Sequence, residues 1–126
     1  MPKEVIAPGN VHKARGFSQA IKAGNTIYLA GQGGIDINGN VVPGGIEAQI
    51  DMAFANLQHI LEAAGAKMTD VVRLNYFLVD IHDLDKIGNA YRKYFGKHFP
   101  TSTAVQISAL AMPEMRIEVE ATAIIG

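Results

Sequence analysis

The sequence predicts an α+β domain in which one mixed β-sheet carries two helices on the same face. Segments rich in β-branched and aromatic residues alternate with two segments whose apolar residues recur at helical spacing. The resulting order of strands, helix, strand, helix and strands gives two helical crossings within one sheet. No repeat, linker or low-complexity segment interrupts this order, so residues 1–126 should form a single domain.

The first thirty residues should form short strands joined by tight turns. A short apolar segment at residues 5–6 and an alternating segment at residues 17–22 are the first two candidates. Gly24-Asn25 is typical of a hairpin turn and leads into residues 26–30. The continuous apolar character of residues 26–30 predicts a strand that is buried on both faces.

Two amphipathic helices are expected, with a central strand between them. The first spans residues 46–64 and is followed by Gly65 as a C-terminal cap. Its polar residues, which fall largely on the face opposite the apolar stripe, are Gln49, Asn56, His59 and Glu62. Residues 71–79 are the longest β-branched and aromatic run and therefore predict the central strand. Asp80–Asp83 should turn the chain and cap the second helix, which Gly96 closes.

The C-terminal third contains two β-rich runs, at residues 98–107 and 116–124, which flank a proline-containing break. This pattern predicts a β-hairpin. In the second run, alternation places Glu118 and Glu120 on one face of a strand and apolar residues on the other. Two carboxylates on one strand face are either a candidate site or a solvated surface.

The strands carry more apolar surface than two helices can cover. The residues responsible are Tyr28, Phe77, Val79, Val105, Ile107 and Ile124. We therefore expect self-association through the uncovered face of the sheet.

Composition excludes several classes of partner. The formal net charge of −1 gives no reason to expect a nucleic acid or an anionic membrane. No apolar run approaches the roughly 18 residues of a membrane span. The chain has no cysteine, which fits a reducing compartment, and residues 1–4 lack the apolar core of a signal peptide, so we expect a cytoplasmic location.

Metal and nucleotide sites are not favoured by the motifs present. The glycine cluster at residues 31–34 is followed by a strand and a turn rather than by the helix that a phosphate loop requires. Asp36, Asn38, Asn40 and Glu47 have the spacing of a calcium loop, but Val41 occupies the position that needs glycine. His59 and Glu62 lack a third ligand nearby, and His82 is expected at the surface. We therefore expect no metal and no organic cofactor.

Several segments spread along nearly the whole chain form a distinctive set: residues 17–25, 28–32, 61–65, 77–80, 89–91, 99–100 and 117–121. Residues 17–25 are similar to Tyr-Ser-Gln-Ala-Val-Lys-Ala-Gly-Asn, and residues 28–32 are similar to a strand that ends in Ser-Gly-Gln. Together these segments resemble the RidA/YjgF family, whose archetype is the enamine/imine deaminase.

The resemblance implies a chorismate-mutase-like fold and a homotrimer with ligand sites in the clefts between subunits. It also implies hydrolysis of reactive 2-imino acids to 2-keto acids and ammonia without a cofactor. Carried over residue by residue, Gly31, Asn89 and Glu118 match site residues of the family, and Ala30 lies at the same strand end as Gly31. In chemical terms, a carboxylate such as Glu118 can activate a water molecule, and a glycine lets the backbone approach a ligand.

Three positions depart from the family pattern. Ser102 stands where the family has its carboxylate-binding arginine, Phe17 replaces a tyrosine, and Ala104 replaces a common cysteine. A charge-assisted arginine contact is worth roughly 1.5–3 kcal/mol, so its loss should lower the affinity for a small carboxylate by about 10- to 100-fold or more. The sequence is therefore identified as an arginine-lacking, divergent member, distinct from the archetypal 2-aminoacrylate deaminase. The cations that could replace the arginine are Arg15, Arg73, Lys97 and Arg116, of which Arg15 is favoured because it precedes Phe17.

Three functions stay open from the sequence. The first, which we favour, is a deaminase or related hydrolase that acts on a larger or less anionic imine or enamine. In this function Glu118 would activate water, and Gly31, Phe17, Ser102, Asn89 and Ala30 would contact the substrate. The second is a trimer that binds or senses a small molecule without turnover. The third is a chaperone-like protein whose role lies in protein contacts.

Overall fold

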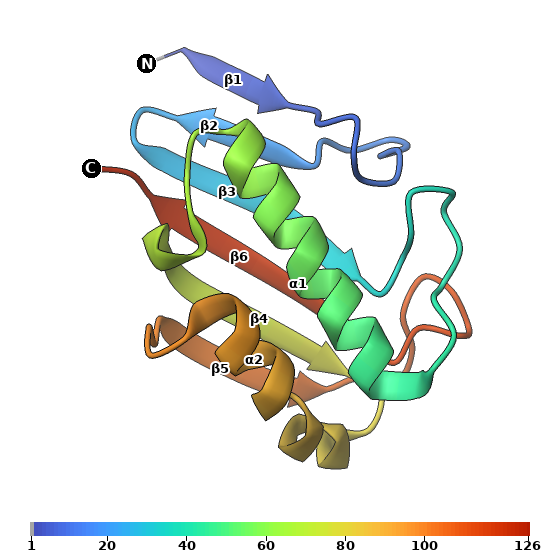
Figure 1. The fold of residues 1–126 in the computed structure, drawn as a ribbon. Coiled ribbons are helices and arrows are strands. Elements are labelled where there is room, and N and C mark those ends of the chain that lie inside the picture. Colours follow the sequence, from blue (N-terminus) through green and yellow to red (C-terminus); the bar gives the residue numbers. More distant parts are fainter. Residues whose placement is uncertain (1) are drawn as a thin grey trace.

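The computed structural model describes residues 2–126 and contains one six-stranded mixed sheet with the strand order β1-β2-β3-β6-β4-β5 (Figure 1). The strands are β1 (Lys3–Ile6), β2 (Ala20–Ala23), β3 (Thr26–Gly33), β4 (Val71–Leu78), β5 (Thr101–Gln106) and β6 (Ile117–Ile124). The helices are α1 (Gly45–Ala63) and α2 (Gly88–Phe95), with short 3-10 helices η1 (Met68–Asp70) and η2 (Ile81–Lys86).

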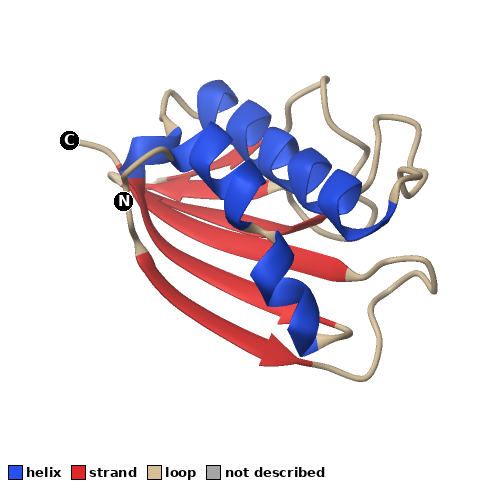
Figure 2. Ribbon diagram, turned by 60° about the horizontal axis from the view of Figure 1, so that its bottom comes forward, coloured by secondary structure: helices blue, strands red, loops and turns tan. Residues whose placement is uncertain are grey.

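Both α-helices lie on the same side of the sheet, which confirms the predicted α+β fold class (Figure 2). β6 is antiparallel to both β3 and β4, and β4 is parallel to β5. It follows that β3, β4 and β5 run in one direction, and that α1 and α2 are the crossovers between them. The predicted end of α1 is also confirmed, because the N–H groups of Gly65 and Ala66 donate to the carbonyls of Glu62 and Leu61.

The C-terminal third is not the β-hairpin that the sequence predicts. β5 and β6 are not neighbours, because β4 lies between them. Ile117, Val119, Ala121 and Ala123 of β6 are buried, which fits a position inside the sheet, whereas most residues of β5 are exposed at the sheet edge. A break that contains proline fits a long connection as well as a tight turn, so the local sequence does not distinguish the two.

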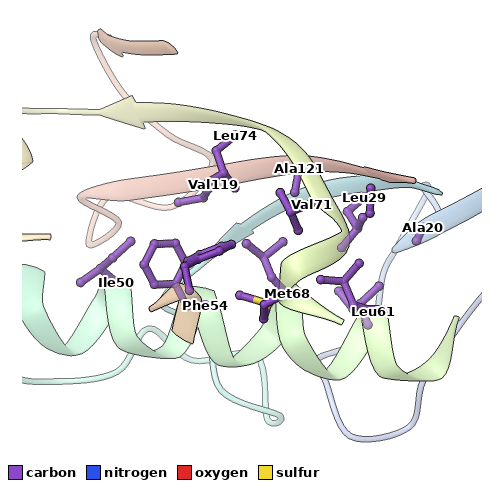
Figure 3. Close-up of a cluster of buried hydrophobic side chains, with 14 of the residues drawn as sticks. Ala20, Leu29, Ile50, Phe54, Leu61, Met68, Val71, Leu74, Val119 and Ala121 are labelled. Atoms are coloured by element: carbon purple, nitrogen blue, oxygen red, sulfur yellow. The ribbon is translucent and has the colours of Figure 1, made fainter. Parts of the chain in front are cut away.

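The core fills the space between α1 and the sheet (Figure 3). Phe54 of α1 is fully buried and meets four aromatic rings edge to face. Figure 3 shows Ile50, Phe54 and Leu61 of α1 facing side chains from several strands, which include Leu29, Leu74, Val119 and Ala121. Burial of these residues supplies the main stabilising free energy of the fold.

Two polar residues of α1 that were predicted to face solvent are buried instead. Gln49 is 4% exposed, and its amide donates to the carbonyl of Glu114 and accepts from the N–H of Arg116. Asn56 is 3% exposed and donates to the carbonyl of Ile35 at 2.9 Å. Backbone partners satisfy both amides, so burial carries no unpaired polar group. These bonds fix the segment after β3 and the start of β6 against α1.

Among the described residues, no helix covers the other face of the sheet, called the open face below. Tyr28 lies on it and is 56% exposed, so the expectation that residues 26–30 are buried on both faces is wrong. Val105 and Ile124 are also exposed there, and Phe77 is half-buried. The predicted apolar open face is therefore confirmed for these residues.

Candidate functional site

Glu118 lies on the open face near the centre of the sheet. The predicted alternation of β6 is confirmed, because Ile117, Val119, Ala121 and Ala123 are buried beneath the helices while Glu118 and Glu120 are only partly buried. In the sheet register, Glu118 lies between Gly33 of β3 and Phe77 of β4. Its carboxylate is therefore presented by a strand that is held on both edges.

Gly31 makes room for the Glu118 side chain. A Cβ atom at position 31 would lie 2.0 Å from Oε1 of Glu118, a distance that no real side chain tolerates. The pairing of β3 with β6 also shifts register between Leu29 and Gln32, so Gly31 sits in an irregular part of the strand. The Glu118 side chain thus packs directly against the backbone of Gly31.

The surroundings of Glu118 favour its protonated form. Burial is the main cause that raises the pKa of Glu118 above its ordinary value, and the nearby charge of Glu120 adds to it. The charge of His12 acts in the opposite direction. Glu120 itself is held by a 2.9 Å hydrogen bond from Nδ2 of Asn75. A carboxylate with a raised pKa is suited to accept a proton and return it.

A cavity of about 480 Å³ surrounds Glu118 and Gly31. One wall is the loop between β1 and β2, which contributes His12, Lys13, Arg15 and Phe17, and another is the connection to β6 around Met112 and Met115. This volume suits a small metabolite. The wall combines cationic and apolar side chains, so the cavity fits a small anion with an apolar portion.

The structure divides the predicted site residues into two groups. Phe17, Gly31 and Glu118 line the same cavity, and Ala30 precedes Gly31 with its N–H bonded to the carbonyl of Gln19. Asn89 lies on α2, where its side-chain oxygen accepts from Arg92.

Ser102 also lies apart from Glu118. It is exposed on β5 and pairs with Leu74, whose side chain points toward the helices. Paired residues of neighbouring strands share a face, so Ser102 and Glu118 belong to opposite faces of the sheet. Within one chain, these two candidate residues do not meet.

Of the four cations considered as replacements for an arginine at position 102, Arg15 is the one that lines the Glu118 cavity. Arg116 donates to Oδ2 of the buried Asp83 at 2.8 Å and is therefore committed to a structural ion pair. Arg73 donates to the hydroxyl of Thr103, and Lys97 lines a separate cavity beside Tyr91 and Phe99.

His12 was not singled out from the sequence, yet it reaches the cavity. Its ring Nε2 lies 3.2 Å from Oε1 of Gln32, and Gln32 in turn donates to Oε1 of Gln19 at 2.7 Å. Both glutamines are buried. A histidine in an irregular loop belongs to no periodic pattern, so hydrophobic periodicity does not identify it. The sequence offers one indirect signal, which is that its partners Gln19 and Gln32 lie in two of the segments that resemble the family.

The described residues contain no group of three or more His, Cys, Asp or Glu side chains placed to hold a metal ion. Asp36 instead accepts hydrogen bonds from the N–H groups of Asn38 and Asn40, which closes the turn after β3. His82 is exposed, as expected, and pairs with Asp80. Between residues 2 and 126, no helix is long and apolar enough to cross a membrane.

The fold and the cavity define a class of small α+β proteins in which a half-buried carboxylate faces a glycine on the open side of a helix-backed sheet. The family model described as Endoribonuclease L-PSP matches residues 9–125. The chain therefore belongs to this family, which is the RidA/YjgF family of the predicted resemblance.

Three relatives illustrate the similarity. A RutC family protein of Pyrococcus horikoshii is 42% identical over 96% of this chain and 97% of its own length. The 2-iminobutanoate/2-iminopropanoate deaminase of Bos taurus is 37% identical over 98% of this chain and 91% of its own length. The crystal structure of RidA from an Antarctic Psychrobacter bacterium superposes with a TM-score of 0.91 at 32% identity, covering 97% of this chain and 99% of the other.

Proposed function

We propose that this protein hydrolyses a small imine or enamine to a carbonyl compound and ammonia, with Glu118 as the group that activates water. The observation that carries the proposal is the carboxylate of Glu118, held over Gly31 in a cavity of metabolite size with its pKa raised by burial. The names of relatives at 35–40% identity, which are 2-iminobutanoate/2-iminopropanoate deaminases, support the same reaction class.

Each part of the cavity has a role in this proposal. Glu118 removes a proton from the water that attacks the C=N carbon. Arg15 attracts the anionic end of the substrate, because a guanidinium group suits a carboxylate. Phe17 forms an apolar wall, and Gly31 leaves the space that the Glu118 side chain occupies.

We also propose that the complete site forms between subunits of a homotrimer, so that Asn89 and Ser102 of one subunit approach Glu118 of the next. Their separation from Glu118 within one chain and the exposed apolar residues of the open face support this assembly. Light scattering should then give three times the 13.5 kDa chain mass. A monomeric mass at micromolar concentration would contradict the assembly.

The substrate should be less dependent on a bound carboxylate than the substrates of the bovine relative. Ser102 donates one neutral hydrogen bond, where the family resemblance places a charged arginine. Arg15, which lines the Glu118 cavity, would offset part of this loss. We therefore expect turnover of 2-iminobutanoate to be about 10- to 100-fold less efficient than with the bovine enzyme.

The test generates imino acids in solution with an amino-acid oxidase and measures how fast added protein removes them from capture by semicarbazide. A panel of amino acids with large, small, neutral and charged side chains gives the specificity, and the bovine deaminase is the positive control. Loss of turnover in Glu118→Gln supports the proposal. A Glu118→Gln protein that loses only ligand affinity would indicate a binding or sensing trimer. If the wild-type protein turns over 2-iminobutanoate as fast as the bovine deaminase, the proposed weakening of the carboxylate site is contradicted.

The family description also names an endoribonuclease. We propose no nucleic-acid partner, because the formal net charge of −1 supplies no general attraction for a phosphate backbone. Incubation with a labelled single-stranded RNA at low salt tests this directly, and cleavage that Glu118→Gln abolishes would overturn it. A cytoplasmic location is likewise part of the proposal.

A further inference from the structure

The loop between β1 and β2 is tied to β3 by a chain of buried hydrogen bonds. Nε2 of Gln19 donates to the carbonyl of His12 at 2.9 Å. Nε2 of Gln32 donates to Oε1 of Gln19 at 2.7 Å and reaches the carbonyl of Ala30 at 3.4 Å. Both amide nitrogens therefore face acceptors, which fixes the orientation of both amides.

This orientation determines which ring nitrogen of His12 carries a hydrogen. With its nitrogen committed, Gln32 presents Oε1, which can only accept, to Nε2 of His12 at 3.2 Å. The hydrogen bond exists only if Nε2 of His12 is protonated. In the neutral ring, Nδ1 is then the nitrogen with a free lone pair, so it is the atom that gains and loses a proton.

His12 and Glu118 converge on the same part of β3. Both line the 480 Å³ cavity, and Glu118 covers Gly31, the residue before Gln32. The charge of His12 lowers the pKa of Glu118. The other charged groups of this region are Lys13 and Arg15 on the same loop and Glu120 on β6. The remaining histidines of the chain, at positions 59, 82 and 98, bond to partners outside the cavity.

We propose that His12 and Glu118 form a coupled proton-transfer pair, in which Nδ1 of His12 is the exchanging atom and Gln32 and Gln19 fix its tautomer. The role of His12 as the acid that complements the base Glu118 rests on the proposed deaminase function. Nothing in the spacing of the sequence identifies this pair.

The reaction balances with these two groups alone. The reaction starts with Glu118 ionised and His12 as the imidazolium, which carries a proton on Nδ1. Water oxygen bonds to the C=N carbon, Glu118 takes a proton from that water, and the π electrons move to nitrogen, which takes the proton from Nδ1 of His12 to give a carbinolamine. The C–N bond then breaks with its electron pair on nitrogen, which receives the proton from Glu118 and leaves as ammonia. Nδ1 of His12 takes the hydroxyl proton, and the carbonyl product forms. Both residues return to their starting states.

The first experiment needs no substrate and uses the intact protein. Nitrogen-15 NMR of the histidine rings should show Nε2–H as the tautomer of the neutral His12 ring. In His12→Gln, the pKa of the Glu118 carboxyl group, followed by carbon-13 NMR, should rise, because the charge of His12 that lowers it is gone. A neutral Nδ1–H form of His12, or a pKa of Glu118 that His12→Gln leaves unchanged, would overturn the pair.

The second experiment measures the pH dependence of kcat/KM on an imine that the wild type turns over. In His12→Gln the new amide can still donate to Gln32, so the fold is kept, but the titrating proton is lost. We expect kcat to fall by about 10²-fold or more, as for removal of a general acid. His59→Gln, which changes a histidine of α1 that bonds to Asn10, is the matched control and should keep wild-type kinetics.

A His12→Gln protein with the wild-type rate and pH profile would overturn the acid role. If the wild type turns over no imine at all, the proposed function fails, and the NMR titration alone decides whether the pair exists.

Discussion

The two faces of the sheet differ in the kind of side chain that they carry and in how far those side chains are buried. The face beneath α1 and α2 is filled by hydrocarbon and aromatic side chains that are almost completely buried. The open face carries carboxylates, amides and exposed aromatic rings, among them Glu118, Asn75 and Tyr28. β6 contributes to both faces through alternate residues. Stability and chemistry are thus separated by one residue along the same strand, and each can be changed with little effect on the other.

The largest effect should come from Glu118→Gln on the open face. Loss of a general base typically lowers kcat by about 10²- to 10⁴-fold, which corresponds to about 3–5 kcal/mol of transition-state stabilisation. Steady-state kinetics with an imine substrate measure it. Glu120→Gln changes a carboxylate two residues along the same face and should lower kcat less than about tenfold, since Glu120 is engaged by Asn75. Equal losses in the two variants would contradict the assignment of Glu118.

On the covered face, Leu74→Ala should act on stability alone. Leu74 is fully buried opposite Ala121, so the variant leaves a cavity and should lose about 2–5 kcal/mol of the free energy of unfolding. Urea denaturation followed by circular dichroism gives this value. The kcat of the fraction that remains folded should stay at the wild-type level, and a fall comparable to that of Glu118→Gln would show that the two faces are not independent.

Gly31→Ala tests the contact between Gly31 of β3 and the side chain of Glu118 of β6. The added methyl group would lie 2.0 Å from Oε1 of Glu118, so the carboxylate must turn away from its place. We expect kcat to fall by about tenfold or more, because small displacements of a catalytic group are costly. Gly9→Ala, at a glycine with open space around it, is the control. Full activity in Gly31→Ala would show that the position of Glu118 over Gly31 is not required.

The smallest effect concerns stability and pH. The pKa of Glu118 is raised in the folded state, so between its ordinary value of 4.5 and the raised value the folded protein binds more protons than the unfolded chain. The stabilising contribution of Glu118 is therefore full below pH 4.5 and is lost as pH rises through the folded-state pKa. Glu118→Gln cannot ionise, so it should unfold at a slightly higher temperature than the wild type at pH 7. This difference should shrink toward pH 4, and a variant that is less stable at pH 7 would contradict the sign.

Elements with a strong local signal were predictable from the sequence. The stripe of α1 and the glycine that ends it follow from helical periodicity, and the alternation of β6 identified Glu118 as a candidate. The neighbours of β6 were not predictable, because strand pairing is decided by burial across the whole sheet. The burial of Gln49 and Asn56 was missed for a similar reason, since their partners are loop carbonyls distant in the sequence.

The candidate site shows the same limit. Family resemblance supplied Gly31 and Glu118, which the structure brings into contact, but it gave no indication of His12, which reaches the cavity from an irregular loop. The wall that surrounds a site residue depends on loop conformation, which hydrophobic periodicity does not encode.

The place of β6 in the sheet has a consequence for how the protein is made. β6 joins β3 to β4, yet it is the last strand to leave the ribosome. Until then, the nascent chain holds two partial sheets, β1-β2-β3 and β4-β5, with unpaired inner edges that are open to aggregation. The strand that joins them also carries Glu118, so a chain that stops before residue 117 lacks both its central strand and its proposed base. Loss of this strand should therefore prevent folding at the same time as it removes the proposed base.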